Sequence, residues 1–335
     1  MMNRRICILN ALVLSCAIAA HALTLKLGSL APGGSPWDNG LRRIAAKWSE
    51  ISGGKVELKI YPGGIAGDEE DMIRKMRIGQ LDAAGMTGVG MCRIYTGVLA
   101  IQLPLLIRSD KELWYVLEKM TPLFEEELHK KGFTVLIWSK VGWVHFFSKS
   151  AVVVPDDLRK LKHFMWAGDP DGVQAWREAG FHPVPLAVTD LMAALQSGMV
   201  ESFATTPLSA ASYQWFGLAK HMCGMKWAPL IGGIVISNAS WKKVPDELKP
   251  KLLETASSIG KELQSEIDKA DAQAVEVMKQ HGLIISSVSP ADEARWKAAT
   301  EKAFVQLAGK SFDATCYELV RQYLEEYRRN NDSEH

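Results

Sequence analysis

"LTLKLGSLAPGGSPWDNGLRRIAAKWSEISGGKVELKIYP", residues 23–62, changes its hydrophobic period twice. Apolar and polar residues alternate from Leu23, which predicts a strand that ends in a Gly/Pro loop. The middle of the stretch has apolar residues at helical spacing, and Ser35 followed by Pro36 predicts where that helix begins. Alternation returns at "KVELKIYP", residues 55–62. The stretch therefore predicts a strand, a helix and a second strand.

The same alternation of elements continues along the chain. "GDEEDMIRKMRIG", residues 67–79, has acids in its first turn and bases in its last, which suits the helix dipole. We interpret the acidic run Asp68–Asp71 as a solvated helical turn. "QLDAAGMTG" follows as an apolar strand, and strands alternate with helices again beyond residue 150. This β-α-β-α-β rhythm, present twice, predicts an α/β protein with two similar halves whose ligands bind beyond the carboxyl ends of the strands.

Two long segments are predicted to join the halves. "FTVLIWSKVGWVHFFSKSAVVV", residues 133–154, is too long for a single ordinary strand. From Pro245 to His281 the pattern is almost continuously helical. A helix of up to about 37 residues would be roughly 55 Å long and would brace both halves. Amphipathic helices over 289–307 and 313–329 complete the chain.

The first 22 residues have the pattern of an export signal. "MMNRR" is basic, and the apolar run that follows is too short to span a bilayer. Val13 to Cys16 resembles a bacterial lipobox, which favours lipidation of Cys16. Release after Ala22 is the alternative, because Ala20 and Ala22 fit the small-x-small rule. Under either alternative the mature protein is expected to be exported and free of membrane spans.

Composition and motifs exclude several functional classes. The 335 residues carry a formal net charge of +1, so nucleic acid is not an expected partner. Walker A, GxSxG, HExxH and strand-associated GxGxxG motifs are missing, and the histidines never adopt ligand spacing. We therefore expect no enzyme, no metal and no cofactor. Cys92, Cys223 and Cys316 form no CxxC pair, and we interpret them as small buried hydrophobes, with one disulfide plus a free thiol as the alternative.

Three separate stretches resemble a known family. The run from Leu27 to Ala84 is similar to the opening of the solute-binding proteins of tripartite ATP-independent periplasmic (TRAP) transporters. "EAGFHPVPLAVTDLMAALQSGMVES", residues 178–202, resembles their central segment. "VISNASWKKVPDELKPKLLETA", residues 235–256, resembles the strand and long helix that follow. The likeness extends in order over about residues 23 to 290.

The resemblance implies a two-lobed periplasmic flytrap with a long bracing helix and no catalysis. Lobe I would comprise residues 23–148 plus 236–282, and lobe II residues 149–235 plus 283–330. The protein would capture a small molecule between the lobes and deliver it to TRAP membrane subunits driven by an ion gradient. A subset of the family works with a tetratricopeptide-repeat lipoprotein, which makes such a lipoprotein a further candidate partner. A periplasmic sensor or scaffold that acts through a protein partner is the alternative function.

One departure from the family pattern bears on the ligand. The strand that in most members carries an Arg for the substrate carboxylate reads "LKHFMW" over 161–166, and Phe164 occupies the position of that Arg. An aromatic floor favours apolar surface, so we expect a hydrophobic or amphipathic ligand. The alternatives are an occluded cleft, or Lys162, His163 or Arg177 as a replacement cation.

Aromatic, hydroxyl and imidazole side chains near the strand ends are the candidate ligand-binding residues. Aromatic rings would supply apolar area, and hydroxyls with one imidazole would supply orienting hydrogen bonds. The candidates are Trp37, Thr87, Trp143, His145, Phe164, Trp166, Thr205, Thr206 and Trp215.

Overall fold

The structure is a computed structural model that describes residues 22–332, except for the side chains of 301–306 and 332. The signal segment before residue 22, its cleavage and the lipidation of Cys16 lie outside the described residues. Within that range no helix is both long and apolar enough to cross a membrane.

The first half of the molecule, lobe I, is built on the predicted β-α-β-α-β unit. Its strands, in order across the sheet, are β2 (Val56–Tyr61), β1 (Leu23–Ser29), β3 (Ala83–Thr87), β9 (Ala228–Ser237) and the first part of β4 (Phe133–Ser148). Its helices are α1 (Pro36–Ile51), α2 (Glu69–Arg77), α3 (Gly88–Met91), the 3-10 helix η1 (Thr96–Gln102), α4 (Asp110–Lys130) and α9 (Asn238–Trp241). β1, β2 and β3 are parallel, and Ser35 caps α1 by accepting a hydrogen bond from the backbone N–H of Asp38, as predicted.

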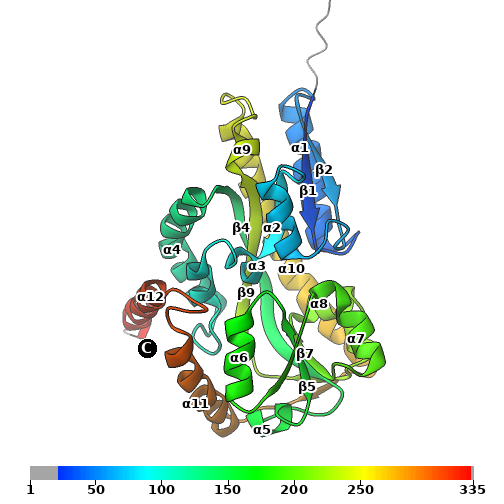
Figure 1. Ribbon diagram of the computed structural model, residues 1–335, viewed down its shortest axis with the longest axis vertical. Helices are drawn as coiled ribbons and strands as arrows, with labels where there is room; N and C mark the ends of the chain where they lie inside the picture. The colour runs from blue at the N-terminus through cyan, green and yellow to red at the C-terminus, as the bar shows by residue number, and fades with distance from the viewer. Residues whose placement is uncertain (1–21, 333–335) are drawn as a thin grey trace, which may run out of the picture.

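The second half, lobe II, repeats the layered arrangement (Figure 1). Its strands are the end of β4, then β7 (Ser202–Thr205), β5 (Lys162–Trp166) and β6 (His182–Leu186), with β8 (His221–Cys223) and β10 (Ile284–Ser286) beside β4. Its helices are α5 (Pro155–Leu158), α6 (Pro170–Glu178), α7 (Leu191–Ser197), α8 (Pro207–Ser212) and α11 (Pro290–Leu307), with short 3-10 turns η2 (Val188–Asp190) and η3 (Trp215–Gly217). β7, β5 and β6 are parallel.

β4 joins the two halves, which confirms the prediction of a crossing strand. Residues Phe133 to Val144 pair with β9, and His145 to Ser148 pair with β7. The register slips between Lys140 and Gly142, so the strand bends before it reaches lobe II.

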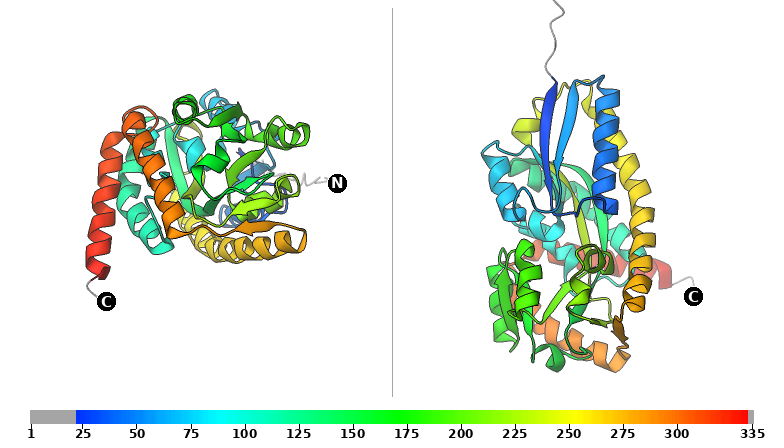
Figure 2. Two further views of the ribbon diagram at one scale, coloured as in Figure 1. Left: turned by 90° about the horizontal axis from the view of Figure 1, so that it is seen from below. Right: turned by 90° about the vertical axis from the view of Figure 1, so that its right-hand side faces the viewer.

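The long helix α10 (Lys249–Gln280) runs beside both halves, as Figure 2 shows. It contacts α1 and β4 in lobe I and α8 in lobe II, which confirms its bracing role. Its predicted start at Pro245 is wrong. Residues 245–248 form a turn, and the helix begins at Lys249 with Pro250 in the first turn, where a missing N–H costs no hydrogen bond. The helix of 32 residues is about 48 Å long.

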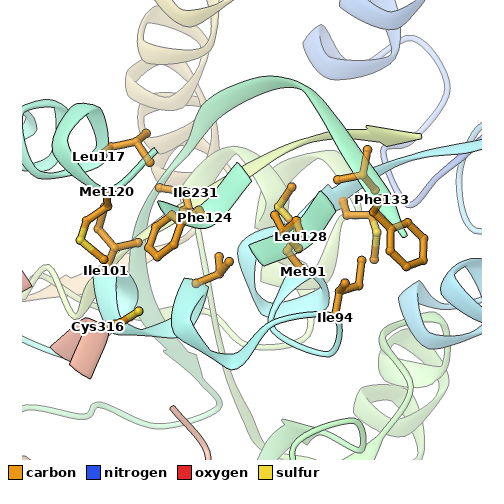
Figure 3. Packing of buried hydrophobic residues seen from close by; sticks show 14 of the residues in the cluster. Met91, Ile94, Ile101, Leu117, Met120, Phe124, Leu128, Phe133, Ile231 and Cys316 are labelled. Atoms are coloured by element: carbon orange, nitrogen blue, oxygen red, sulfur yellow. The ribbon is translucent and has the colours of Figure 1, made fainter. Parts of the chain in front are cut away.

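The largest core cluster lies around α4 (Figure 3). Phe124 and Leu128 are completely buried there, against strand residues such as Ile231 and against Cys316 of α12 (Ala314–Asp332). Cys92, Cys223 and Cys316 are free and buried. The division into lobes at residues 148 and 235 stays a prediction. The packing differs from it in two places: β9 lies in the sheet of lobe I although the predicted boundary puts most of it in lobe II, and α12 contacts α4 and η1 whereas α11 contacts α5 and α6.

Candidate functional site

A cavity of about 420 Å³ lies between the two halves. We call it the cleft cavity; both lobes and the connecting strands line it. Lobe I contributes the loop after β1, the ends of β3 and η1, and one face of α1, while lobe II contributes the end of β5 and the segment around Tyr213. Its volume falls within the range of about 300–1,000 Å³ that is usual for small-molecule sites.

Six of the nine candidate residues line this cavity. They are Trp37, Thr87, Phe164, Trp166, Thr205 and Trp215. Phe164 lies between His163 and Met165, which also line the cavity, so the end of β5 forms a continuous part of its wall. Near that wall Tyr213 stacks on Trp215 with ring centroids 4.3 Å apart.

Trp143, His145 and Thr206 lie outside the cavity, which corrects the predicted set. Val144 lines the cavity, and because side chains alternate along a strand, Trp143 and His145 point to the opposite face. The indole N–H of Trp143 donates to Asp110, and Nδ1 of His145 lies 3.0 Å from a backbone carbonyl. Burial lowers the pKa of His145. The Thr206 hydroxyl caps α8 and is likewise engaged inside the fold.

None of the proposed replacement cations brings a positive charge to the cavity. Lys162 and Arg177 line a separate surface depression beside β6, and the Lys162 ammonium donates to the carbonyl of Gly198. His163 does line the cavity, but burial lowers its pKa to about 3, so the imidazole is neutral at physiological pH. Among the described residues around the cleft cavity, none is a lysine or an arginine.

A buried acid, Glu69, lines the cavity instead. Asp68 and Glu69 are both buried, which corrects our interpretation of Asp68–Asp71 as solvated for these two residues, whereas Glu70 is exposed. Glu69 lines the cavity, is almost fully buried, and accepts hydrogen bonds from the N–H and hydroxyl of Thr87 at 2.6 and 2.9 Å. Burial, with a smaller contribution from the charge of Asp68, raises the pKa of Glu69 to about 7. Helical charge patterning could not reveal this burial, because the covering segments are distant in sequence.

Two hydrogen bonds join lobe II to lobe I at the wall of the cavity. The indole N–H of Trp166 donates to the buried carboxylate of Asp68 at 2.7 Å. The Tyr213 hydroxyl donates to the carbonyl of Leu30 in the loop after β1. The two aromatic side chains therefore form part of the wall and also hold the lobes together.

Sequence reasoning also missed Gln102 and the glycines of β9. Gln102 is the last residue of η1 and lines the cavity. The sequence of η1 shows no hydrophobic period that could have predicted which of its side chains is buried. Gly232 and Gly233 also line the cavity. A Cβ at Gly232 would lie 2.7 Å from the carbonyl oxygen of Met86, and a Cβ at Gly233 would lie 2.3 Å from that of Ile137. Such contacts require glycine, and the paired glycines within an apolar strand were the available signal.

Two α/β lobes joined by crossing strands, with a solute-sized cavity between them, define the class of two-lobed solute-binding proteins. The profile of the DctP family, bacterial extracellular solute-binding protein family 7, matches residues 27–310. The chain belongs to this family of TRAP transporter receptors, which bind solutes and are not enzymes.

Individual relatives agree over most of their length. A solute-binding protein of Chromohalobacter salexigens is 23% identical over 297 residues, 88% of each chain. The sialic acid-binding periplasmic protein SiaP of Vibrio cholerae is 22% identical over 282 residues, 82% of this chain and 86% of that one.

Solved structures confirm the fold. A TRAP periplasmic solute binding protein of C. salexigens with bound D-glucuronate superposes with a TM-score of 0.83 at 21% identity, covering 90% of this chain and 99% of that one. One from Sulfurospirillum deleyianum with bound succinate gives a TM-score of 0.82 at 20% identity, covering 90% and 98%.

Proposed function

We propose that this receptor captures a hydrophobic or amphipathic small molecule in the cleft cavity and delivers it to ion-gradient-driven TRAP membrane subunits. One observation carries the proposal: no lysine or arginine is among the described residues lining the cavity. The family resemblance supports it, because it places Phe164 at the position where most members have an arginine. The proposal departs from the organic acids bound by the relatives named above.

Electrostatics and desolvation both support an apolar ligand. Burying a carboxylate without a cation costs several kcal/mol, and here it would also approach Glu69 and the neighbouring Asp68. An apolar ligand avoids that cost and gains about 25 cal/mol for each Å² it removes from water. Phe164, Met165 and Trp166 provide such surface at one wall.

Calorimetric titration against short organic acids and against fatty or aromatic compounds tests the proposal. Phe164→Ala should weaken binding of the apolar ligand by about 2–4 kcal/mol, as truncation of a buried aromatic does. Phe164→Arg should abolish it, because the guanidinium would be desolvated without a partner.

Lys162→Ala and Arg177→Ala are the matched controls, because both residues lie outside the cavity. These variants should bind as the unaltered protein does. The proposal would be overturned if succinate or another small dianion bound tightly, if the Phe164 variants bound it equally well, and if Lys162→Ala or Arg177→Ala no longer bound it.

The family is periplasmic, and we further propose that Cys16 anchors the mature chain to a membrane through a lipid. Metabolic labelling with a palmitate analogue should mark the protein. Cys16→Ala should abolish both the label and membrane fractionation; unchanged labelling would instead favour release after Ala22.

The TRAP membrane subunits and a tetratricopeptide-repeat lipoprotein are proposed partners on the family resemblance alone. Native mass spectrometry of gently purified protein distinguishes the receptor from the sensor or scaffold alternative. A small apolar co-purifying mass supports the receptor, whereas a bound protein without any small molecule supports the alternative.

A further inference from the structure

Gln102 lines the cleft cavity, and its side chain holds an unpaired buried donor. The side chain is 6% exposed, and its Oε1 accepts a hydrogen bond from the backbone N–H of Ile231 at 3.0 Å. That bond fixes the orientation of the amide, because only the oxygen can accept from an N–H. Nε2 is therefore a donor, and among the described residues it has no hydrogen-bond partner.

Trp37 brings a second donor of the same kind. It lies in the first turn of α1, lines the cavity, and its buried Nε1 has no partner among the described residues. Other indole groups of the protein are engaged: Trp48 and Trp296 donate to backbone carbonyls, and Trp166 donates to Asp68. A buried N–H without an acceptor is rare in folded proteins, so two at one cavity indicate what its ligand supplies.

We propose that the ligand is an uncharged, largely apolar molecule whose acceptor oxygens receive hydrogen bonds from Gln102 Nε2 and Trp37 Nε1. This inference rests on the proposed function and narrows its ligand class to apolar ketones, esters, amides or ethers. An indole N–H and an amide NH₂ can only donate, so the ligand must accept. A pure hydrocarbon would leave both buried groups unmatched.

The charges around the cavity argue against an ionised head group. A carboxylate would accept from both donors, but no lysine or arginine among the described lining residues would offset the cost of burying its charge. Both donors belong to lobe I, whereas Phe164 and Met165 belong to lobe II. The ligand's oxygens therefore face lobe I, and its apolar surface meets β5.

The test measures dissociation constants of straight-chain probes of equal length: a hydrocarbon, a methyl ketone, a methyl ester, a carboxylate and a primary ammonium. The unaltered protein should prefer the ketone or ester over the hydrocarbon by about tenfold for each donor satisfied. Gln102→Leu and Trp37→Phe should each reduce that preference by about tenfold and leave hydrocarbon binding nearly unchanged. The ratio of two affinities measured on one sample is insensitive to partial misfolding.

Gln174→Leu and Trp114→Phe are the matched controls, because both side chains are exposed and lie away from the cavity. They should keep the full preference. Gln102→Met provides a second variant if the leucine variant fails to fold, since its unbranched side chain is closer in length to glutamine and carries no donor.

Each remaining outcome has a distinct meaning. A hydrocarbon that binds as tightly as the ketone, a preference unchanged in the variants, or tight binding of the ammonium alone would overturn this inference and leave the apolar receptor standing. Tight binding of the straight-chain carboxylate alone would also overturn this inference, because such a chain is still an amphipathic ligand. Binding of succinate in place of all these chains would overturn the proposed function itself.

Discussion

One face of β4 carries a buried positive charge, and among the described residues the face that lines the cleft cavity carries none. Ser139 and Val141 line the cleft cavity, whereas Lys140 between them points to the other face. There its ammonium contacts the carboxylates of Asp110 in α4 and Asp268 in α10 at 2.9 and 2.8 Å. The Lys140 side chain is only 4% exposed. Burial lowers its pKa, but the two carboxylates outweigh that effect and the pKa is raised.

The difference teaches that this fold accommodates a buried cation where carboxylates from two other elements meet it. Lys140 ties β4 to α4 and α10 and so serves the framework. The opposite face of the same strand, one residue away, has no such cation and offers a ligand apolar surface. Three measurements test whether charge is divided between framework and cavity in this way.

The largest expected effect concerns Glu69, the acid at the cavity. Its folded pKa of about 7 lies above the ordinary 4.5, so the folded state binds the proton more tightly than the unfolded state. This contribution to stability is fully present below pH ~4.5 and is lost as pH rises through about 7. Relative to Glu69→Gln, the unaltered protein should lose about 3 kcal/mol of unfolding free energy between pH ~4 and ~8.

Denaturant unfolding of both proteins at several pH values checks this. The protonation of His163 also makes stability depend on pH, but it contributes equally to both proteins and drops out of their difference. Equal pH dependence of the two proteins would show that Glu69 is solvated and that the cavity is more polar than described.

The next effect concerns Lys140. Lys140→Met should lower the unfolding free energy by about 2 kcal/mol, less than for a fully buried pair because Asp110 and Asp268 remain about half exposed. Binding of the apolar ligand should be unchanged, since the side chain faces away from the cavity. Denaturant titration and calorimetry measure the two quantities, with the exposed Lys160→Met as control. A binding defect at unaltered stability would contradict the division of roles.

The smallest effect concerns the bond between Trp166 and Asp68. Trp166→Phe keeps aromatic area and removes the donor, so closure of the lobes should weaken by about 1 kcal/mol. Ligand dissociation should become about fivefold faster, and small-angle scattering without ligand should give a larger radius of gyration. Trp114→Phe is the control. Unchanged dissociation and scattering would show that this bond does not hold the lobes together.

Local patterns predicted much of the fold and part of the site. Strand and helix periods located β1, α1 and the crossing strand, and the motif around Phe164 located one wall of the cavity. Trp143 and His145 were misplaced because the phase of alternation in β4 depends on a bulge near Gly142 that no period reveals. Gln102 and Glu69 acquire their roles through residues distant in sequence, and local pattern carries no information about such contacts.

The glycine backbone at Gly232 and Gly233 has a consequence for how this receptor diversifies. Substitutions there must displace the main chain of β3 or β4, so variation at this part of the cavity is costly to the fold. Side chains on β5 and around Tyr213 carry no such restriction. Changes of ligand preference are therefore expected to arise from side chains on lobe II, with the glycine surface of lobe I retained.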